Sequence, residues 1–316
     1  MADVRVFAGT SGQRFAQEMC DDLGVPLSPV NLQRFANDCL QVQLLENCRE
    51  RDVYLVQPII TPTQENLMEL LLMIDAAKGA SAQRITAVMP HFAYARSDKK
   101  DAPRISVGGR LVADLLETAG VNRVLTMTLH APQVHAFFRV PTDQLNALRE
   151  LAGHFEPGDL YRTTVVSPDL GNAKPASAFA KMLGVPVAAA AKERLDGDRV
   201  EITSLIGDVT DRDIIVLDDE IAGGTTIIAL LELLREQRAR TVRIACTHGI
   251  FGGDSLQRIA ADSSVAEIVT TNTIPSAEAQ VHDKLTVISV AGAFAEAVRR
   301  IHTGESVSAL FDPTHV

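Results

Sequence analysis

The stretch IIVLDDEIAGGTT, residues 214–226, decides the fold of this chain. Its four leading apolar residues predict a buried strand, its Gly-Gly pair predicts a loop, and the apolar-periodic run IIALLELL that follows predicts a helix. In an open parallel sheet, ligands bind beyond the carboxyl ends of the strands. This loop therefore lies where a ligand site is expected.

The residues of this loop suit a sugar phosphate. Asp218 and Asp219 would accept hydrogen bonds from hydroxyl groups or bind a divalent cation. Gly223 and Gly224 allow close approach of the backbone, and the N–H groups at the start of the next helix favour an anion. The alternative is an ordinary strand-to-helix turn, since Asp is a common helix cap and Gly a common turn residue.

Length and composition limit the class of protein. A chain of 316 residues predicts two α/β units, and 46% hydrophobic with 22% charged residues is typical of a globular protein with a sizeable core. The net charge of −10 argues against a nucleic-acid partner or an acidic membrane surface, because such binding needs clustered Lys and Arg.

The sequence shows no targeting signal and no paired cysteine spacing, which predicts a cytoplasmic protein. The first residues, MADVRVFAGTSGQRF, have no signal-peptide pattern. The longest apolar run, LMELLLMIDAA from Leu67, is interrupted by Glu69 and Asp75 and is too short to span a bilayer. The four cysteines show no CxxC spacing, which suits reduced thiols.

Strand and helix signals alternate along the whole chain. Short apolar or β-branched runs are separated by helix-length segments such as NLMELLLMIDAAKGA and VGGRLVADLLETAG, which argues for parallel sheets with helices on both faces. The expected strands are VRVFAG, VYLVQP, ITAVMP, VLTMTL, TVVSPD, VPVAAAA, IIVLDD, VRIACTHG and IVTTNT. A changeover near residues 141–163 predicts two similar α/β domains, 1–147 and 148–316, each a parallel sheet flanked by helices.

Polar residues follow several of these strands, where the sheet rule places ligand contacts. They are Arg96, Asp98, Lys99, Lys100, Asp101, Arg104, His130, Asp169, Gly171, Lys174, Lys192, Glu193 and Arg194. Gly171 and Lys174 would suit a second phosphate site, and the stretch from Lys192 to Val200 is typical of a mobile hairpin. The alternatives are a solvated charged loop and a hydrogen-bonded structural histidine.

These segments resemble the class I ribose-phosphate pyrophosphokinases nearly from end to end. The matching segments are RFAN from Arg34, MELLLMIDAAKGASA, YARSDKK, LLETAG, LHAPQVHAFF, VSPDLGNAK, AKER, LDDE, THGIF, TNTIP and HTGESVSALF. The resemblance implies a phosphoribosyltransferase-like fold in each domain. It also implies transfer of the pyrophosphoryl group of ATP to the 1-hydroxyl of ribose 5-phosphate, giving phosphoribosyl pyrophosphate (PRPP) and AMP with Mg²⁺.

The resemblance also implies roles for single residues. The catalytic loop contains Lys192 and Arg194, and the metal positions are His130 and Asp169. The ATP-binding positions are Phe35, Asn37, Arg96 and Asp101, the first two supplied to a neighbouring subunit. Ribose 5-phosphate binds at Asp218, Asp219, Gly223, Gly224, Thr225 and Thr226, and the pyrophosphate loop contains Gly171 and Lys174.

Three departures from the family pattern affect these expectations. Cys39 stands where the family has a Glu that helps to read adenine, and residues 105–107 replace an R-x-P-I-type segment. In the loop DDxxDTxGT, Ala222 replaces a third carboxylate, Gly223 replaces a Thr and Thr225 replaces a Gly. A missing acceptor costs about 1–3 kcal/mol if it leaves a hydroxyl unpaired, which weakens binding without abolishing it.

The family also implies a homo-oligomer, built from dimers and up to a hexamer. Gln133, Asp143 and the run from Ser306 to Ser308 stand at positions associated with regulation by phosphate and ADP. Two alternatives remain. One is a non-catalytic regulatory homologue, similar to PRPP-synthase-associated proteins. The other is a phosphoribosyltransferase, which normally needs only one such domain.

Overall fold

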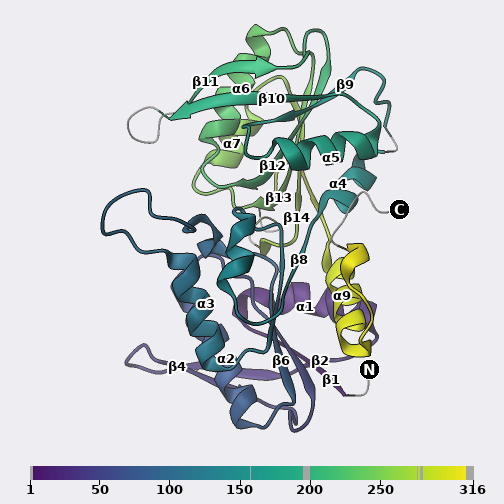
Figure 1. The fold of residues 1–316 in the computed structure, drawn as a ribbon. Coiled ribbons are helices and arrows are strands. Elements are labelled where there is room, and N and C mark those ends of the chain that lie inside the picture. Colours follow the sequence, from purple (N-terminus) through teal and green to yellow (C-terminus); the bar gives the residue numbers. More distant parts are fainter. Residues whose placement is uncertain (1–2, 157, 195–199, 276, 278–279, 311–316) are drawn as a thin grey trace. The chain divides into compact units, whose positions relative to one another are not determined.

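A computed structural model describes residues 3–156, 158–194, 200–275, 277 and 280–310 (Figure 1). The chain forms two compact units. Among the described residues, unit 1 comprises 3–146, 273–275 and 290–310, and the remainder form unit 2. No helix in these ranges is both long and apolar enough to cross a membrane.

Unit 1 is built on a six-stranded sheet in the order β2-β1-β5-β6-β7-β8, in which every neighbouring pair is parallel. Its strands are β1 (Val4–Ala8), β2 (Leu27–Ser28), β5 (Asp52–Val56), β6 (Arg84–Met89), β7 (Arg123–Met127) and β8 (Thr142–Leu145). All five residues of β5 are buried, as expected for a central strand covered on both faces.

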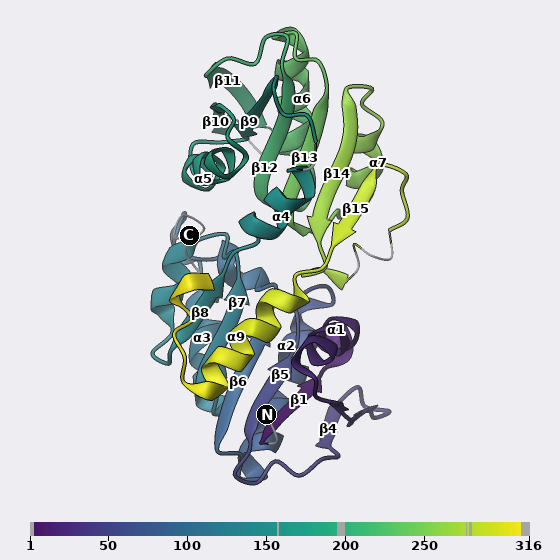
Figure 2. The ribbon, with the colours of Figure 1, turned by 90° about the vertical axis from the view of Figure 1, so that its right-hand side faces the viewer.

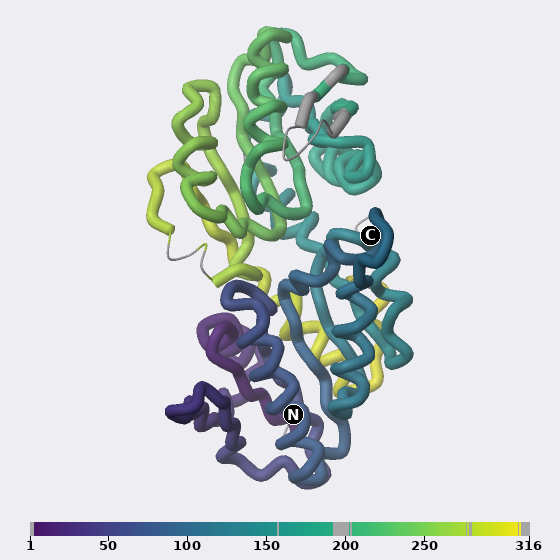
Figure 3. Tube along the Cα trace, turned by 90° about the vertical axis from the view of Figure 1, so that its left-hand side faces the viewer, coloured from purple at the N-terminus to yellow at the C-terminus, as the bar shows by residue number. Residues whose placement is uncertain are grey.

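Helices cover both faces of this sheet. They are α1 (Gln13–Leu23), α2 (Thr63–Gly79), α3 (Gly108–Ala119) and α9 (Ala291–Thr303), with the short 3₁₀ segments η1 (Thr10–Gly12), η2 (Ala93–Arg96), η3 (Pro132–Phe137) and η4 (Ser308–Leu310). Figure 3 shows α2 and α3 in front of the sheet, and Figure 2 shows α9 and α1 on the opposite side. The rings of Phe15 and Phe294 join α1 to α9 edge to face, with centroids 5.2 Å apart.

Helix α9 comes from the end of the chain but belongs to unit 1. A simple division at residue 147 assigns it to the second half. Its apolar face is buried at Phe294, Val298 and Ile301, and His302 Nδ1 on α9 also lies 2.9 Å from Oδ2 of the buried Asp52 on β5. Arg84 on β6 binds the same carboxylate, with Nε 2.9 Å from Oδ1, so α9 is fixed to two central strands.

A separate antiparallel hairpin, β3 (Val30–Arg34) and β4 (Leu40–Leu44), packs beside α2. Val30, Val42 and Leu44 contact the core of unit 1, whereas Asn31, Gln41 and Gln43, which alternate with them along the strands, are exposed. This hairpin was not predicted, because half of the residues in its strands are polar.

Unit 2 contains a seven-stranded sheet in the order β11-β10-β9-β12-β13-β14-β15. Its strands are β9 (Thr163–Ser167), β10 (Val187–Arg194), β11 (Val200–Ile206), β12 (Asp213–Ile221), β13 (Val242–Gly249), β14 (Val265–Thr271) and β15 (Leu285–Ile288). All pairs are parallel except β10 with the edge strand β11, which is antiparallel. The predicted fold class, two α/β units each with a parallel sheet flanked by helices, is confirmed.

The helices of unit 2 lie on opposite faces of its sheet (Figure 1). They are α4 (Leu148–Phe155), α5 (Ala173–Leu183), α6 (Thr225–Glu236) and α7 (Ser255–Ala260). Phe155 and Phe179 join α4 to α5, with ring centroids 6.2 Å apart. On the other face, Ile227 and Leu231 of α6 and Ile259 of α7 pack into a core with β12 and β13.

Candidate active site

Three adjacent strands carry the predicted site residues of unit 2. β9 lies between β10 and β12, so the segments that follow β9 and β12 begin at the same edge of the sheet. Asp169, Gly171 and Lys174 follow β9, whereas the Asp218–Thr226 stretch begins within β12. The structure therefore brings these two groups of residues together, as the sheet rule predicts.

Strand β12 is longer than expected. The apolar run predicts a strand that ends at the two aspartates, but in the structure the strand continues to Ile221. The reason is that β13 also continues, so that Asp218 pairs with Cys246 and Ile221 with Gly249. On the other side, pairing with β9 ends at Val216, and the side-chain amide of Asn172 donates to the carbonyl of Leu217 at 2.7 Å.

The carboxylates of this region perturb one another. Asp218 is half-buried, and its pKa is raised well above the ordinary value by burial, by the negative charge and side chain of Asp219 and by the charge of Asp169. The N–H of Asp219 donates to Asp218 Oδ1 at 2.9 Å and partly opposes this shift. Such crowding of negative charge favours a cationic or hydroxyl-bearing ligand at this edge.

Backbone hydrogen bonds fix the loop after β12. The carbonyl oxygen of Ala222 accepts the N–H of Gly252 at 2.8 Å and the hydroxyl of Ser255 at 3.3 Å. Gly224 has φ of 73°, and a Cβ there would lie 3.0 Å from Ile259 Cδ1. At Gly223, in contrast, a Cβ would meet nothing within 4 Å. Of these two glycines, only Gly224 has a backbone conformation and close neighbours that disfavour a larger residue.

Helix α6 begins at Thr225 without a side-chain cap. Thr225 is exposed and Thr226 half-buried, so their hydroxyl groups and the first N–H groups of α6 lie at the same place. An uncapped helix start favours an anion such as a phosphate.

The loop after β9 is closed by Asp169. Its carbonyl accepts the Ser167 hydroxyl at 2.6 Å, and its Oδ1 accepts the N–H of Asn172 at 3.0 Å. A Cβ on Gly171 would lie 3.1 Å from Asp169 Oδ1, so glycine gives this carboxylate room. Lys174 is exposed in the first turn of α5. Asn172 was missed by the sequence analysis, although its place in SPDLGNAK was a signal.

The predicted catalytic residues belong to β10, the strand on the other side of β9. Lys192 and Arg194 are in the last part of β10, where their backbones pair with Ile202 and Val200 of β11. Of these two residues the structure describes only the backbone, and the hairpin tip at 195–199 lies outside the described residues.

In unit 1, two predicted segments follow the adjacent strands β6 and β7. Arg96 ends η2 and is exposed, as are Asp101 in the following loop and His130 after β7. A hydrogen bond from Gln133 Nε2 to the carboxylate of Asp98 joins the two segments. This contact was not predicted.

Phe35 and Asn37 come from the turn between β3 and β4. The Phe35 side chain is 44% exposed, and Asn37 Oδ1 accepts the N–H of Cys39 at 3.3 Å. Arg34 forms ion pairs with Asp38 in the turn and Glu65 in α2. The turn is therefore tied to α2 and presents Phe35 outward, and Cys39 is an exposed free thiol.

The described residues contain no group of three or more His, Cys, Asp or Glu side chains arranged to hold a metal ion. The two predicted metal positions belong to different units, His130 to unit 1 and Asp169 to unit 2. Their joint role stays a prediction.

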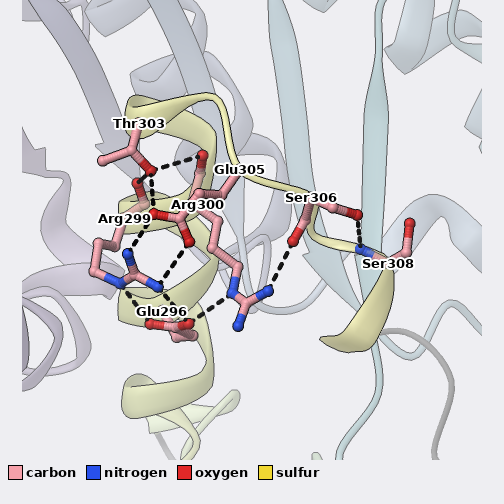
Figure 4. Close-up of polar contacts among 7 residues, drawn as sticks. All are labelled: Glu296, Arg299, Arg300, Thr303, Glu305, Ser306 and Ser308. Carbon is pink, nitrogen blue, oxygen red and sulfur yellow. Dashed lines mark hydrogen bonds and ion pairs between the residues drawn. The ribbon is translucent and has the colours of Figure 1, made fainter. Parts of the chain in front are cut away.

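The run from Ser306 to Ser308 is fixed to helix α9 by a hydrogen bond from Arg300 (Figure 4). Arg300 donates to Glu296 Oε1 at 2.6 Å and to the carbonyl of Ser306 at 2.8 Å, and the N–H of Ser308 donates to Ser306 Oγ at 3.3 Å. Hydrogen bonds from Arg299 and Arg300 lower the pKa of Glu296 to about 2. Asp143, at another position that the resemblance associates with regulation, is buried and forms an ion pair with Arg123.

Comparisons with known proteins cover nearly the whole chain. Residues 4–120 match the family described as the N-terminal domain of ribose phosphate pyrophosphokinase, and residues 167–312 match the phosphoribosyl synthetase-associated domain. A Streptomyces coelicolor protein, named a ribose-phosphate pyrophosphokinase only provisionally, is 65% identical over 99% of this chain and 98% of its own length. The ribose-phosphate pyrophosphokinase of Deinococcus radiodurans is 47% identical over 97% of both chains.

A solved structure agrees with these relatives. The crystal structure of phosphoribosylpyrophosphate synthetase from Mycobacterium smegmatis superposes with a TM-score of 0.89 at 36% identity, covering 96% of this chain and 99% of that one. The resemblance found in the sequence is confirmed. This chain belongs to the ribose-phosphate pyrophosphokinase family.

Proposed function

We propose that this chain transfers the pyrophosphoryl group of ATP to the 1-hydroxyl of ribose 5-phosphate, giving PRPP and AMP. The observation that carries this proposal is the loop after β12, where Asp218 and Asp219 lie shortly before the uncapped start of α6. Membership of the family supports it.

The sugar phosphate would bind along this loop. The first N–H groups of α6, with the hydroxyl groups of Thr225 and Thr226, suit the 5-phosphate. Asp218 and Asp219 would accept hydrogen bonds from the ribose hydroxyls and so orient the sugar for attack by its 1-hydroxyl. Gly171 and Lys174, on the neighbouring segment, would bind the pyrophosphate group.

ATP would be bound by unit 1 and by a second copy of the chain. Arg96 at the end of η2 directly precedes an exposed loop that contains Asp101 and the cations Lys99, Lys100 and Arg104, which suits a triphosphate. Phe35 and Asn37 face outward from their hairpin, which supports their contribution to a neighbouring subunit. Lys192 and Arg194 would neutralise the charge that develops on the group in transfer.

Mg²⁺ fits the donor set of these residues. Carboxylate oxygens are its usual protein ligands, and the pKa of Asp218 is raised by burial and by the negative charges of Asp219 and Asp169, which a cation at this edge would offset. Mg²⁺ is commonly held by one or two protein groups together with substrate phosphates, which agrees with Asp169 and His130 as its contacts. When bound, it would neutralise phosphate oxygens during the transfer.

The test is a product assay with ATP, Mg²⁺, phosphate and ribose 5-phosphate, followed by ³¹P NMR. We expect equal amounts of AMP and PRPP, and none when ribose 5-phosphate is omitted. ADP as the product would contradict the proposal. Tight ATP binding without AMP would instead identify a regulatory homologue, the alternative with which Ala222 and Cys39 agree.

We propose a homo-oligomer in the cytoplasm as the setting of this reaction. All four cysteines are free, which agrees with a reducing compartment. Sedimentation velocity should show a dimer or a larger assembly, and a monomer at micromolar concentration would rule out the shared ATP site.

A further inference from the structure

One side chain holds together the two ends of the basic loop in unit 1. This loop, residues 97–107, connects η2 to α3, and residues 99–106 are all exposed. Its cations are Lys99, Lys100 and Arg104. Ser97 stands at its first position, and none of the roles assigned above involves it.

Ser97 caps helix α3 from a distance in the sequence. Its Oγ accepts the N–H of Gly108, 11 residues later, at 2.8 Å, and its carbonyl accepts the N–H of Gly109 at 3.0 Å. Val107, which immediately precedes α3, provides no side-chain cap. The first two N–H groups of α3 are therefore satisfied by one residue on the opposite side of the loop.

Two glycines allow this contact. A Cβ on Gly108 would lie 3.0 Å from Ser97 Oγ and 3.1 Å from Tyr94 Cδ1, and a Cβ on Gly109 would lie 3.0 Å from the Tyr94 carbonyl oxygen. Helix α3 thus begins directly against η2, the turn that ends at Arg96. The glycine pair lies next to residues 105–107, where the chain departs from its family pattern.

A second contact fixes the loop just beyond Ser97. The carboxylate of Asp98 accepts a hydrogen bond from Gln133 in η3. Only the stretch after Asp98 therefore projects into solvent, with its base held at Ser97 and Asp98. Because the N–H groups of Gly108 and Gly109 are occupied, the start of α3 is not available to a phosphate.

We propose that Ser97 is a positioning residue whose hydroxyl keeps this loop closed against α3, so that Arg96 and the loop cations are presented to the triphosphate of ATP. The inference rests on the proposed function, since it assigns ATP to this loop. Opening of the loop would cost ATP affinity and leave the ribose 5-phosphate site in unit 2 unchanged.

The variants Ser97→Ala, Ser97→Thr and Thr118→Ala test this role. Thr118 is the matched control, because its exposed hydroxyl also forms a hydrogen bond with the backbone of α3, donating to the carbonyl of Asp114 at 2.7 Å, but at the far end of the helix. Loss of a helix-capping hydroxyl typically shifts local opening by about 2- to 30-fold. We expect Ser97→Ala to speed hydrogen exchange in the peptide containing Gly108 and Gly109 by such a factor.

Ser97→Ala should also raise the KM for ATP, and the dissociation constant of a non-hydrolysable ATP analogue, by a similar factor. The KM for ribose 5-phosphate should stay unchanged, the midpoint of thermal unfolding should fall by roughly 1–8 °C, and Ser97→Thr should behave as wild type. Unchanged hydrogen exchange in Ser97→Ala, or a loss in Ser97→Thr equal to that in Ser97→Ala, would overturn the capping role.

Faster hydrogen exchange with unchanged analogue affinity would overturn the positioning role. The proposed function fails separately, if the wild-type chain makes no AMP and PRPP. In that case hydrogen exchange and analogue binding still decide whether Ser97 positions a nucleotide-binding loop.

Discussion

The two glycines of the loop after β12 should respond differently to the same added methyl group. Gly224 has φ of 73° and would place a Cβ 3.0 Å from Ile259 Cδ1 and 3.3 Å from Ser255 Cβ. A left-handed conformation costs an alanine about 1–2 kcal/mol, before any displacement of α7. Gly223 has no neighbour within 4 Å of its Cβ position, so Gly223→Ala should change stability by less than about 0.5 kcal/mol.

The measurement is thermal and urea unfolding of Gly224→Ala and Gly223→Ala without ligand, followed by calorimetric titration with ribose 5-phosphate. At about 2–4 °C per kcal/mol, Gly224→Ala should lower the midpoint by roughly 2–8 °C. It should also weaken ribose 5-phosphate binding, because the loop and the start of α6 must shift. Equal losses of stability in the two variants would refute the assignment of the strain to Gly224.

Three further predictions concern charged residues. Lys192→Ala should lower turnover by orders of magnitude with little change in ATP affinity, whereas Lys181→Ala, exposed in α5, should not. Asp218→Asn should raise the unfolding midpoint of the ligand-free protein at pH 7. The carboxyl group of Asp218 keeps its proton to a higher pH in the folded state than in the unfolded chain, so its ionisation lowers stability and asparagine avoids that loss. The gain in the midpoint should therefore fade as the pH falls toward about 3.9. Burial opposes ionisation of Asp52, but hydrogen bonds from Arg84 and His302 outweigh it and lower the pKa. Asp52→Asn should therefore cost stability above pH 4, and urea titration should show this difference shrinking as the pH falls through the lowered pKa.

Local patterns were sufficient to predict nine of the strands, the fold class and the positions of the loops that follow those strands. The apolar run before Asp218 and the helical period after Thr226 both persist in the structure. What they could not predict depends on partners far away in the chain. Strand β12 continues to Ile221 only because β13 pairs with it, and β8 was missed because its buried Asp143 is compensated by Arg123 on another strand.

The same limit explains α9 and Ser97. Helix α9 shows a clear amphipathic pattern, yet its partners in unit 1 lie far away in the chain, as Asp52 does for His302 and Phe15 for Phe294. The cap of α3 likewise comes from Ser97 across a loop, where the rule for helix starts looks only at the residue immediately before the helix. Neither partner is marked by its own neighbours in the sequence.

The structure also bears on how the altered ribose-phosphate loop would act. Ala222 holds this loop through its carbonyl oxygen, which accepts hydrogen bonds from Gly252 and Ser255, and a backbone group is unaffected by the loss of a side-chain carboxylate. Gly224 keeps its left-handed conformation, and Gly223 has space for the larger residue of the family pattern. We therefore expect the departure to remove a ligand contact and to leave the shape of the loop unchanged. Such a loss raises the KM for ribose 5-phosphate more than it lowers turnover, provided that the missing contact is made equally in the ground and transition states.

Ala222→Asp should then lower the KM for ribose 5-phosphate by about 5- to 150-fold with a small change in kcat. A large gain in kcat from this substitution would instead mean that the third carboxylate acts in the transition state, and that the chain as it stands is catalytically impaired.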